Sequence, residues 1–249
     1  MRFGIAVFPG TWSDRDCAHA VSLDGHEAVM LWHRGTDLRG ADCVILPGGF
    51  SHGDHLRAGA IARFAPLMDA VADFAAGGGL VWGICNGFQI LCEAHLLPGA
   101  LMRNASLEFR CEPAWLRVET TASPFTAGCR GGDVLRIPVS HGEGRYVADP
   151  DTLIRLEAED RVALRYVSPD GGPAGELSPN GSMRDIAGIL GERRNVLGMM
   201  PHPERACEPL LGGVDGMALI RSVAAALDRD GGVAGVPGAP AGGGRGRSE

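Results

Sequence analysis

Short apolar runs alternate with helical patterns through the N-terminal part of the chain. Four continuous runs are typical of parallel strands buried on both faces: 3–8, 28–32, 42–46 and 80–84. Apolar residues at helical spacing predict three helices between and after them: 13 or 14 to 23, 58–76, and 86 to about 94. This β-α-β order predicts an α/β fold, with a doubly wound, mostly parallel, flavodoxin-like sheet and helices on both faces.

The pattern changes after about Pro98. Apolar runs then follow one another with little helix between them: 109–118, 134–139, 162–166, 186–190 and 196–200. Gly191–Asn195 is predicted to be a hairpin connection between the last two runs, and Asp215–Leu227 a closing helix. The C-terminal half is therefore expected to add extra strands to the sheet.

The end of the chain has a different composition. Residues 228–249 are mostly glycine, alanine and proline. So few apolar side chains cannot offset the entropy that is lost when a chain is ordered. We therefore expect one domain, residues 1–227, and a disordered tail, residues 228–249.

Composition and charge exclude several classes of protein. The 249-residue chain is 45% hydrophobic, enough for a sizeable core, and its net charge of −7 without a basic block argues against nucleic-acid binding. No apolar stretch approaches membrane-spanning length. The seven cysteines form no C-x-x-C pair and are odd in number, which argues against a disulfide framework and for a reducing compartment. Because the N-terminus begins with a strand pattern in place of a signal-peptide layout, we expect a cytoplasmic protein.

The apolar run 80–84 leads into Gly83-Ile84-Cys85-Asn86-Gly87, and a helical pattern follows at once. This is the layout of a nucleophile elbow, with cysteine where hydrolases carry serine. Glycines on both sides permit a tight strand-to-helix turn, which places the sulfur at a helix N-terminus where N–H groups favour a thiolate. A lone buried cysteine is more often structural, but this context favours Cys85 as a nucleophile.

Two histidines are candidates for the base that a cysteine nucleophile needs. His202 follows a strand, and Pro203 favours an extended conformation in which Glu204 lies on the same side as the imidazole. Glu204 would then orient His202 by the logic of the serine triad. His141 also follows a strand and has Glu143 two residues later, but its flanking glycines suit a flexible loop that a ligand approaches. His202 is therefore the preferred base.

Two loops carry weaker signals. Gly48-Gly49 follows the strand at 42–46, and a glycine amide can approach an oxyanion closely, although a plain turn is the commoner role of such a pair. His52 and His55 are residue types that bind metals, but no third group of ligands accompanies them. We therefore expect no metal site.

The motifs together resemble a known family. The segments around Cys85 and His202 are similar to those of class I (triad-type) glutamine amidotransferases. Further motifs narrow the resemblance to the small glutaminase subunits of phosphoribosylformylglycinamidine synthase, an enzyme of purine biosynthesis: Leu46–Ala62, Asn104-x-Ser106-x-x-Phe109, His141–Gly144 and Pro179–Ser182. The resemblance extends from about Phe3 to Leu227.

The resemblance implies roles for individual residues. Cys85 would attack the side-chain amide of glutamine, His202 would transfer the proton, and Glu204 would orient His202. The backbone amides of Gly49 and Asn86 would hold the oxyanion. Four residues are expected at the glutamine-binding site: Gln89, Asn104, Ser106 and His141.

The resemblance also implies partners. No cofactor is expected in this chain, and the ammonia would pass to a large synthetase subunit that uses ATP and Mg²⁺ to activate formylglycinamide ribonucleotide. A small third subunit bridges the two in many bacteria. Trp12-Ser13 and the pair His52 and His55 depart from residues usual in the family, and these departures are expected to affect subunit contacts.

Two other functions remain open at this stage. One is a cysteine peptidase or thioesterase on a similar scaffold, although the chain order Cys, His, Glu differs from the nucleophile, acid, base order of α/β-hydrolases. The other is a catalytically silent scaffold subunit, against which the complete set of Cys85, His202 and Glu204 argues.

Overall fold

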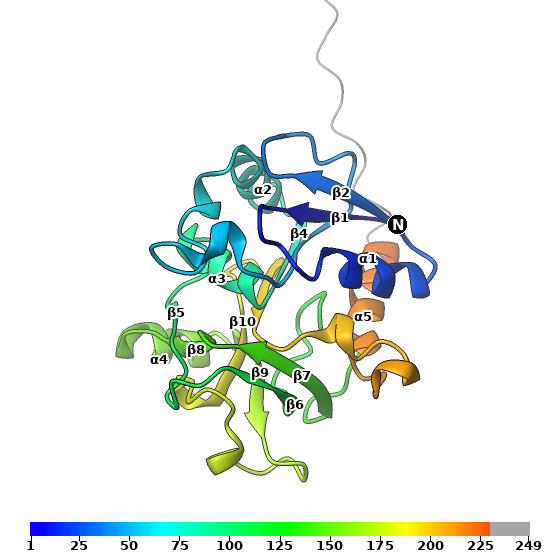
Figure 1. The fold of residues 1–249 in the computed structure, drawn as a ribbon. Coiled ribbons are helices and arrows are strands. Elements are labelled where there is room, and N and C mark those ends of the chain that lie inside the picture. Colours follow the sequence, from blue (N-terminus) through cyan, green and yellow to red (C-terminus); the bar gives the residue numbers. More distant parts are fainter. Residues whose placement is uncertain (230–249) are drawn as a thin grey trace, which may run out of the picture.

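The computed structural model describes residues 1–229, which are built around one nine-stranded sheet (Figure 1). Five neighbouring strands are parallel: β2 (Glu27–Trp32), β1 (Arg2–Val7), β3 (Cys43–Leu46), β4 (Leu80–Ile84) and β11 (Val196–Met199). Four antiparallel strands continue the sheet: β10 (Ile186–Leu190), β9 (Val162–Val167), β6 (Arg110–Val118) and β7 (Val134–His141). The predicted fold class, with extra strands in the C-terminal half, is confirmed.

Helices cover both faces of the parallel half, and the side chains of β4 show why. Trp82 is buried on the face covered by α1 (Asp14–Leu23) and α5 (Gly216–Arg229), where it shares a small apolar space with Cys17 and Ile220. Its neighbour Gly83 faces α3 (Asn86–Glu93), because successive residues of a strand point to opposite faces. The helix α2 (Pro66–Ala76) also packs against β4. Figure 1 shows α1 and α5 on one side of these strands and α2 and α3 on the other.

Two features of the fold differ from the sequence prediction. The helix expected from residue 58 begins at Pro66, because the residue before a proline is pushed out of the helical conformation and Ala65 is extended, with ψ 140°. A helix that the apolar pattern did not predict, α4 (Pro150–Ala158), begins where the side chain of Asp149 accepts a hydrogen bond from the N–H of Thr152. The helix forms because Asp149 caps its first turn and Pro150 favours the first helical position, although the apolar periodicity of the segment is weak.

The remaining elements are short. β5 (Ala100–Met102) and β8 (Arg145–Val147) pair as a separate antiparallel ribbon. Single 3₁₀ turns lie at Ser51–Asp54, Ala62–Phe64, Gly175–Leu177, Met183–Asp185, Pro203–Arg205 and Pro209–Leu211. The hairpin expected at Gly191–Asn195 is confirmed, because it joins the antiparallel pair β10 and β11.

The closing helix extends to Arg229, two residues beyond the predicted end of the domain. The predicted tail otherwise lies outside the described residues, which end at 229. Within residues 1–229, no helix is both long and apolar enough to cross a membrane.

Candidate active site

Three adjacent parallel strands bring the predicted reacting groups to one edge of the sheet. Leu46 of β3 pairs with Gly83 of β4, and Ile84 of β4 pairs with Met199 of β11. The carboxyl ends of β3, β4 and β11 therefore lie side by side. The segments that follow these ends hold the glycine pair at 48–49, Cys85 and His202, so residues far apart in the sequence meet here.

Cys85 occupies a strained turn between β4 and α3. Its backbone has φ 52° and ψ −106°, a conformation that few non-glycine residues adopt. The turn is held because the N–H of Cys85 donates to the carbonyl of Met199 at 2.8 Å. A side chain at Gly87 would collide with the carbonyl of Leu46, so the helix can approach β3 this closely only with glycine there. These features are those of a nucleophile elbow.

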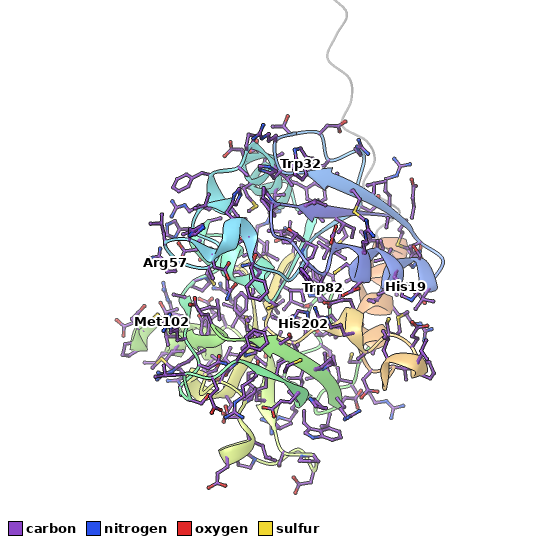
Figure 2. All side chains as sticks on the ribbon, in the orientation of Figure 1. His19, Trp32, Arg57, Trp82, Met102 and His202 are labelled. Carbon is purple, nitrogen blue, oxygen red and sulfur yellow. The ribbon has the colours of Figure 1, made fainter. Side chains whose placement is uncertain are left out.

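His202 and Glu204 form a buried pair. Nδ1 of His202 and Oε1 of Glu204 are 2.6 Å apart, and the two residues are 1% and 2% exposed. Burial lowers the pKa of His202, but the carboxylate of Glu204 and then the sulfur of Cys85 raise it to about 10. Figure 2 shows His202 in the middle of the molecule, whereas His19 lies at the periphery. The imidazole therefore has an ordered carboxylate on one nitrogen and the candidate nucleophile near the other.

The thiol of Cys85 also contacts a backbone carbonyl. Sγ of Cys85 contacts the carbonyl oxygen of Ser140 at 3.7 Å. Nε2 of His202 has no hydrogen-bond partner within residues 1–229, although Cys85 is near enough to affect the pKa of the imidazole. A side chain at Gly48 would lie 2.6 Å from Cε1 of His202, so this glycine leaves room for the ring. Cys85, His202 and Glu204 thus lie together as the members of a triad.

Arg205 connects the triad to the first loop of the chain. Its Nη2 donates to Oγ of Ser13 at 2.9 Å, and its Nε lies 3.9 Å from Oε1 of Glu204. Ser13 is fully buried, whereas the adjacent Trp12 is 73% exposed. Of the two departures at this position, Trp12 is placed where a partner could contact it, but Ser13 instead positions the arginine beside Glu204.

Two backbone amides are available near Cys85. The N–H of Asn86 is at the first position of α3, where a helix offers no internal acceptor. Gly49 pairs with Thr11 in an isolated bridge, and the hydrogen bonds of this bridge are made by the flanking residues. Gly49 is thus the non-hydrogen-bonded member, so its own N–H points away from Thr11. Gly49 and Cys85 line the same cavity.

This cavity has a volume of about 190 Å³ and lies across the junction of the two halves of the sheet. The parallel half contributes Cys85 and the segment after β3. The antiparallel half contributes the wall that continues from β7, namely residues 140–143. Gln89 of α3 also lines the cavity, and its Nε2 donates to the carbonyl of Glu143 at 2.6 Å. The side chain of Gln89 thus fastens the two sides of the cavity together.

Comparison with known proteins decides the family. Residues 1–212 match the model of the CobB/CobQ-like glutamine amidotransferase domain. PurQ, a subunit of phosphoribosylformylglycinamidine synthase, is 58% identical in Moorella thermoacetica, over 90% of this chain and 95% of the relative. The same subunit of Rubrobacter xylanophilus is 56% identical, over 90% of this chain and 98% of the relative. The chain belongs to the PurQ family of glutamine amidotransferases.

A solved structure supports the same assignment. A chain in the structure of PurLQS from Thermotoga maritima is 42% identical and superimposes with a TM-score of 0.81, over 91% of this chain and 98% of that chain. The amidotransferase fold is therefore shared over nearly its whole length.

The structure separates the four residues expected to bind glutamine into two groups. Gln89 and His141 line the cavity of this amidotransferase. Asn104 and Ser106 are not among its lining residues. Asn104 is fully buried and holds the antiparallel wall, because Nδ2 donates to the carbonyl of His141 at 2.9 Å and Oδ1 accepts from the N–H of Gly144 at 3.0 Å. Ser106 is exposed and its hydroxyl accepts from the N–H of Glu108.

His141 has different surroundings from His202. Its Nε2 lies 3.1 Å from Nδ2 of Asn180, an amide and not a carboxylate. Burial, followed by the nearby His202, lowers the pKa of His141 to about 3. His141 is therefore neutral at physiological pH, and an amide takes the place of the carboxylate that a catalytic base uses for orientation.

Two residues of the site lie in motifs that carry the resemblance, but the sequence assigned no role to them. Asn180 donates to the carbonyl of Gly144 and lies beside His141, so it fixes the wall from a strand connection far along the chain. Asp54 lines the cavity near Glu143, and burial together with that carboxylate raises its pKa to about 6. Asp54 lies in the His-Gly-Asp-His loop that we considered for metal binding. Within residues 1–229, no group of three or more His, Cys, Asp and Glu side chains is arranged to hold a metal ion.

Proposed function

We propose that this chain hydrolyses glutamine to glutamate and ammonia as the glutaminase subunit of a phosphoribosylformylglycinamidine synthase. The observation that carries this proposal is the buried His202–Glu204 pair, 2.6 Å between Nδ1 and Oε1, beside a cysteine on a strained elbow. The identity to PurQ subunits supports the choice of this synthase among amidotransferases.

The reaction follows from the positions of these groups. The sulfur of Cys85 attacks the side-chain amide carbon of glutamine, and its proton passes to Nε2 of His202. The negative oxygen that forms accepts hydrogen bonds from the N–H groups of Gly49 and Asn86. His202 then gives the proton to the amide nitrogen, the carbon–nitrogen bond breaks, and ammonia leaves a glutamyl thioester on Cys85. Water, deprotonated by His202, attacks the thioester and releases glutamate.

Glu204 stabilises the protonated form of His202 during both halves of the reaction. Because this carboxylate and the Cys85 sulfur raise the pKa of His202 to about 10, transfer of the thiol proton to the imidazole is favoured. Arg205 and Ser13 hold the position of Glu204 without contacting the substrate.

The charges around the cavity suit the amino end of glutamine. Asp54 and Glu143 line it, and burial, followed by the charge of Glu143, raises the pKa of Asp54. A bound ammonium group would relieve this repulsion, since an opposite charge favours the ionised carboxylate. We place the α-ammonium group of glutamine near Asp54 and its side-chain amide at Cys85.

The ammonia would be used by a large synthetase subunit, with ATP and Mg²⁺, and a small third subunit would complete the assembly. All seven cysteines are free, which suits the reducing conditions of the cytoplasm. We expect a low rate for the isolated chain, because loops form much of the cavity wall, among them the segment with Asp54 and residues 142–143. Closure by a partner that covers these loops would complete the site.

The test measures glutamate production by the purified chain alone and with both partner subunits, ATP, Mg²⁺ and formylglycinamide ribonucleotide. We expect strong stimulation in the complete mixture and labelling of Cys85 by a glutamine-analogue chloroketone. Equal rates in the two conditions would refute gating by the partner. Faster hydrolysis of simple esters than of glutamine would favour the thioesterase alternative, and absence of both activities in the complex would favour a silent scaffold.

A further inference from the structure

A second cavity lies at the ends of the parallel strands opposite to the active site. Its volume is about 450 Å³, compared with about 190 Å³ for the cavity at Cys85. It is bordered by the end of α2, the segment after α3, helix α4 and the β10–β11 hairpin. Asn195, the residue before β11, closes one side of the cavity. Its side chain donates to the carbonyl of Ala75 in α2 and to that of Gly79, the residue before β4. Such a volume is in the range of small-molecule sites.

Three arginines converge on this cavity from separate elements. Arg155 comes from α4, Arg161 from the turn that follows α4, and Arg193 from the hairpin. Glu192 is the one acidic residue among the lining residues, and His95 is also present. The chain has no lysine, and all 23 of its Lys and Arg residues are arginine, so the choice of arginine over lysine here says nothing about a ligand. The grouping of three arginines at one cavity is informative, because the chain as a whole has a net charge of −7.

Arg161 is unusually well buried for an arginine, with an exposed fraction of 7%. Its Nε donates to the carbonyl of Leu190 at 3.0 Å, and its Nη1 donates to Glu159 at 2.8 Å. Its Nη2 makes no hydrogen bond within residues 1–229 and is not among the enclosed, unpartnered side-chain atoms of that part of the chain, and Arg161 lines the cavity. A buried guanidinium group is expensive unless its donors are used, so a free donor at a cavity points to a missing acceptor.

The other two arginines are anchored in the same manner. Nη1 of Arg193 donates to the carbonyl of Ala76, and Nη2 of Arg155 donates to Oγ1 of Thr152. In each case one terminal nitrogen is held by the protein and the other has no protein acceptor in the described residues. Anchoring reduces the entropy lost when a ligand binds. A planar guanidinium with a free edge matches the oxygens of a phosphate group.

We propose that this cavity binds a small phosphomonoester, with the phosphate held by Arg155, Arg161 and Arg193. The phosphate would accept hydrogen bonds from the free guanidinium nitrogens. The rest of the ligand would lie against the apolar part of the wall, which includes Leu96, Pro98 and Val196. The site is separate from the triad and does not depend on the glutaminase assignment.

The test is isothermal titration calorimetry of the full chain with ribose 5-phosphate, with inorganic phosphate and with ribose. We expect ribose 5-phosphate to bind more tightly than phosphate, and ribose not to bind. The double variant R155Q/R193Q should weaken ribose 5-phosphate binding at least about tenfold, because it removes two charged donors to the phosphate. Both arginines are exposed, so the variant should fold, whereas loss of Arg161 would disturb buried contacts.

The matched control is R15Q/R130Q, which also removes two charges, both from exposed positions outside the cavity. It should bind ribose 5-phosphate as the unaltered chain does, and both double variants should retain the glutaminase rate and the melting temperature. Binding that R15Q/R130Q weakens as much as R155Q/R193Q would show a general charge effect and overturn the site. So would absence of binding by a folded, glutaminase-active chain.

Discussion

The parallel and antiparallel halves of the sheet contribute to the candidate site in different ways. In the parallel half, backbone geometry places the reacting groups: Cys85 lies on a turn held by the carbonyl of Met199, and Gly49 lies beside the first loop. In the antiparallel half, side-chain amides do this work. Asn104 and Asn180 hold the segment that contains His141 through hydrogen bonds to its backbone and ring.

This difference separates chemistry from substrate placement. The groups that make and break bonds follow the ends of parallel strands, whose positions the sheet itself determines. The wall that faces them depends on a few buried polar contacts and can be altered without moving the nucleophile. Substitutions of the reacting groups on the parallel side should therefore reduce kcat, and those on the antiparallel side should mainly raise KM.

The largest effect is expected at the nucleophile. Cys85→Ala should abolish glutamine hydrolysis and leave the fold intact, because it removes the attacking atom and little volume. Cys92→Ala is the matched control: this cysteine lies on the same helix, is 4% exposed, and has a thiol whose pKa burial raises. Glutamate production by each variant, assayed in the complex, provides the measurement. A substantial rate in Cys85→Ala would refute the elbow assignment.

The two histidines give the next comparison. His202→Ala should lower kcat by ~10²–10⁴-fold, the usual contribution of acid–base catalysis. Glu204→Ala should lower it by less. His141→Ala should affect KM more than kcat, because His141 is neutral and contacts Asn180 in place of a carboxylate. Steady-state kinetics of the three variants would distinguish the roles, and a larger loss of kcat in His141→Ala than in His202→Ala would reverse them.

The sequence predicted the parallel side well because its signals are local. The elbow at Cys85 is a continuous motif, and the carboxylate of Glu204 is two residues from the histidine that it contacts. The alternation of strands and helices also predicted a mostly parallel sheet. The position of β11 beside β4 could not be predicted, but any parallel arrangement with these two strands adjacent would place Cys85 and His202 at the same ends of the strands.

The antiparallel side could not be predicted in the same way. Asn180 is 36 residues from Gly144 and 39 from His141, and no spacing rule connects positions so far apart. Asp54 lies within the motif at 46–62 but was given no role in substrate binding, because its proximity to Glu143 depends on two loops of different strands. The resemblance brought Asn104 into the site, but only the structure shows that its amide groups hold the wall.

A pair of buried asparagines tests whether the wall is important for substrate binding. Asn180→Ala removes contacts with His141 and Gly144, and Asn195→Ala removes two contacts with backbone carbonyls at the opposite ends of the parallel strands. Each should destabilise the fold by about 1–3 kcal/mol, the cost of unpaired buried polar groups. Only Asn180→Ala should raise KM for glutamine, by roughly tenfold or about 1.4 kcal/mol. Urea denaturation would first show that the two variants have lost a similar free energy of unfolding. Equal KM values for glutamine would then contradict the proposed role of the wall.

The smallest effect is expected at Asp54, where it also depends on pH. Its pKa in the folded chain, about 6, is above the ordinary value for aspartate, because burial and Glu143 disfavour the charge. The folded state therefore binds more protons than the unfolded state between roughly pH 4 and pH 6, and the contribution of Asp54 to the free energy of unfolding decreases as the pH rises through this window.

The proposed binding of glutamine needs the ionised form of Asp54, so kcat/KM should increase with pH up to about 6. Asp54→Asn should remove both dependences and raise KM about fivefold near neutral pH, an effect of about 1 kcal/mol. Asp69→Asn, at an exposed position of α2, removes the same charge and should change neither. If the pH profiles of Asp54→Asn and the unaltered chain coincide, the ammonium group of glutamine is held elsewhere, and the negative side of the cavity must be assigned to Glu143 alone.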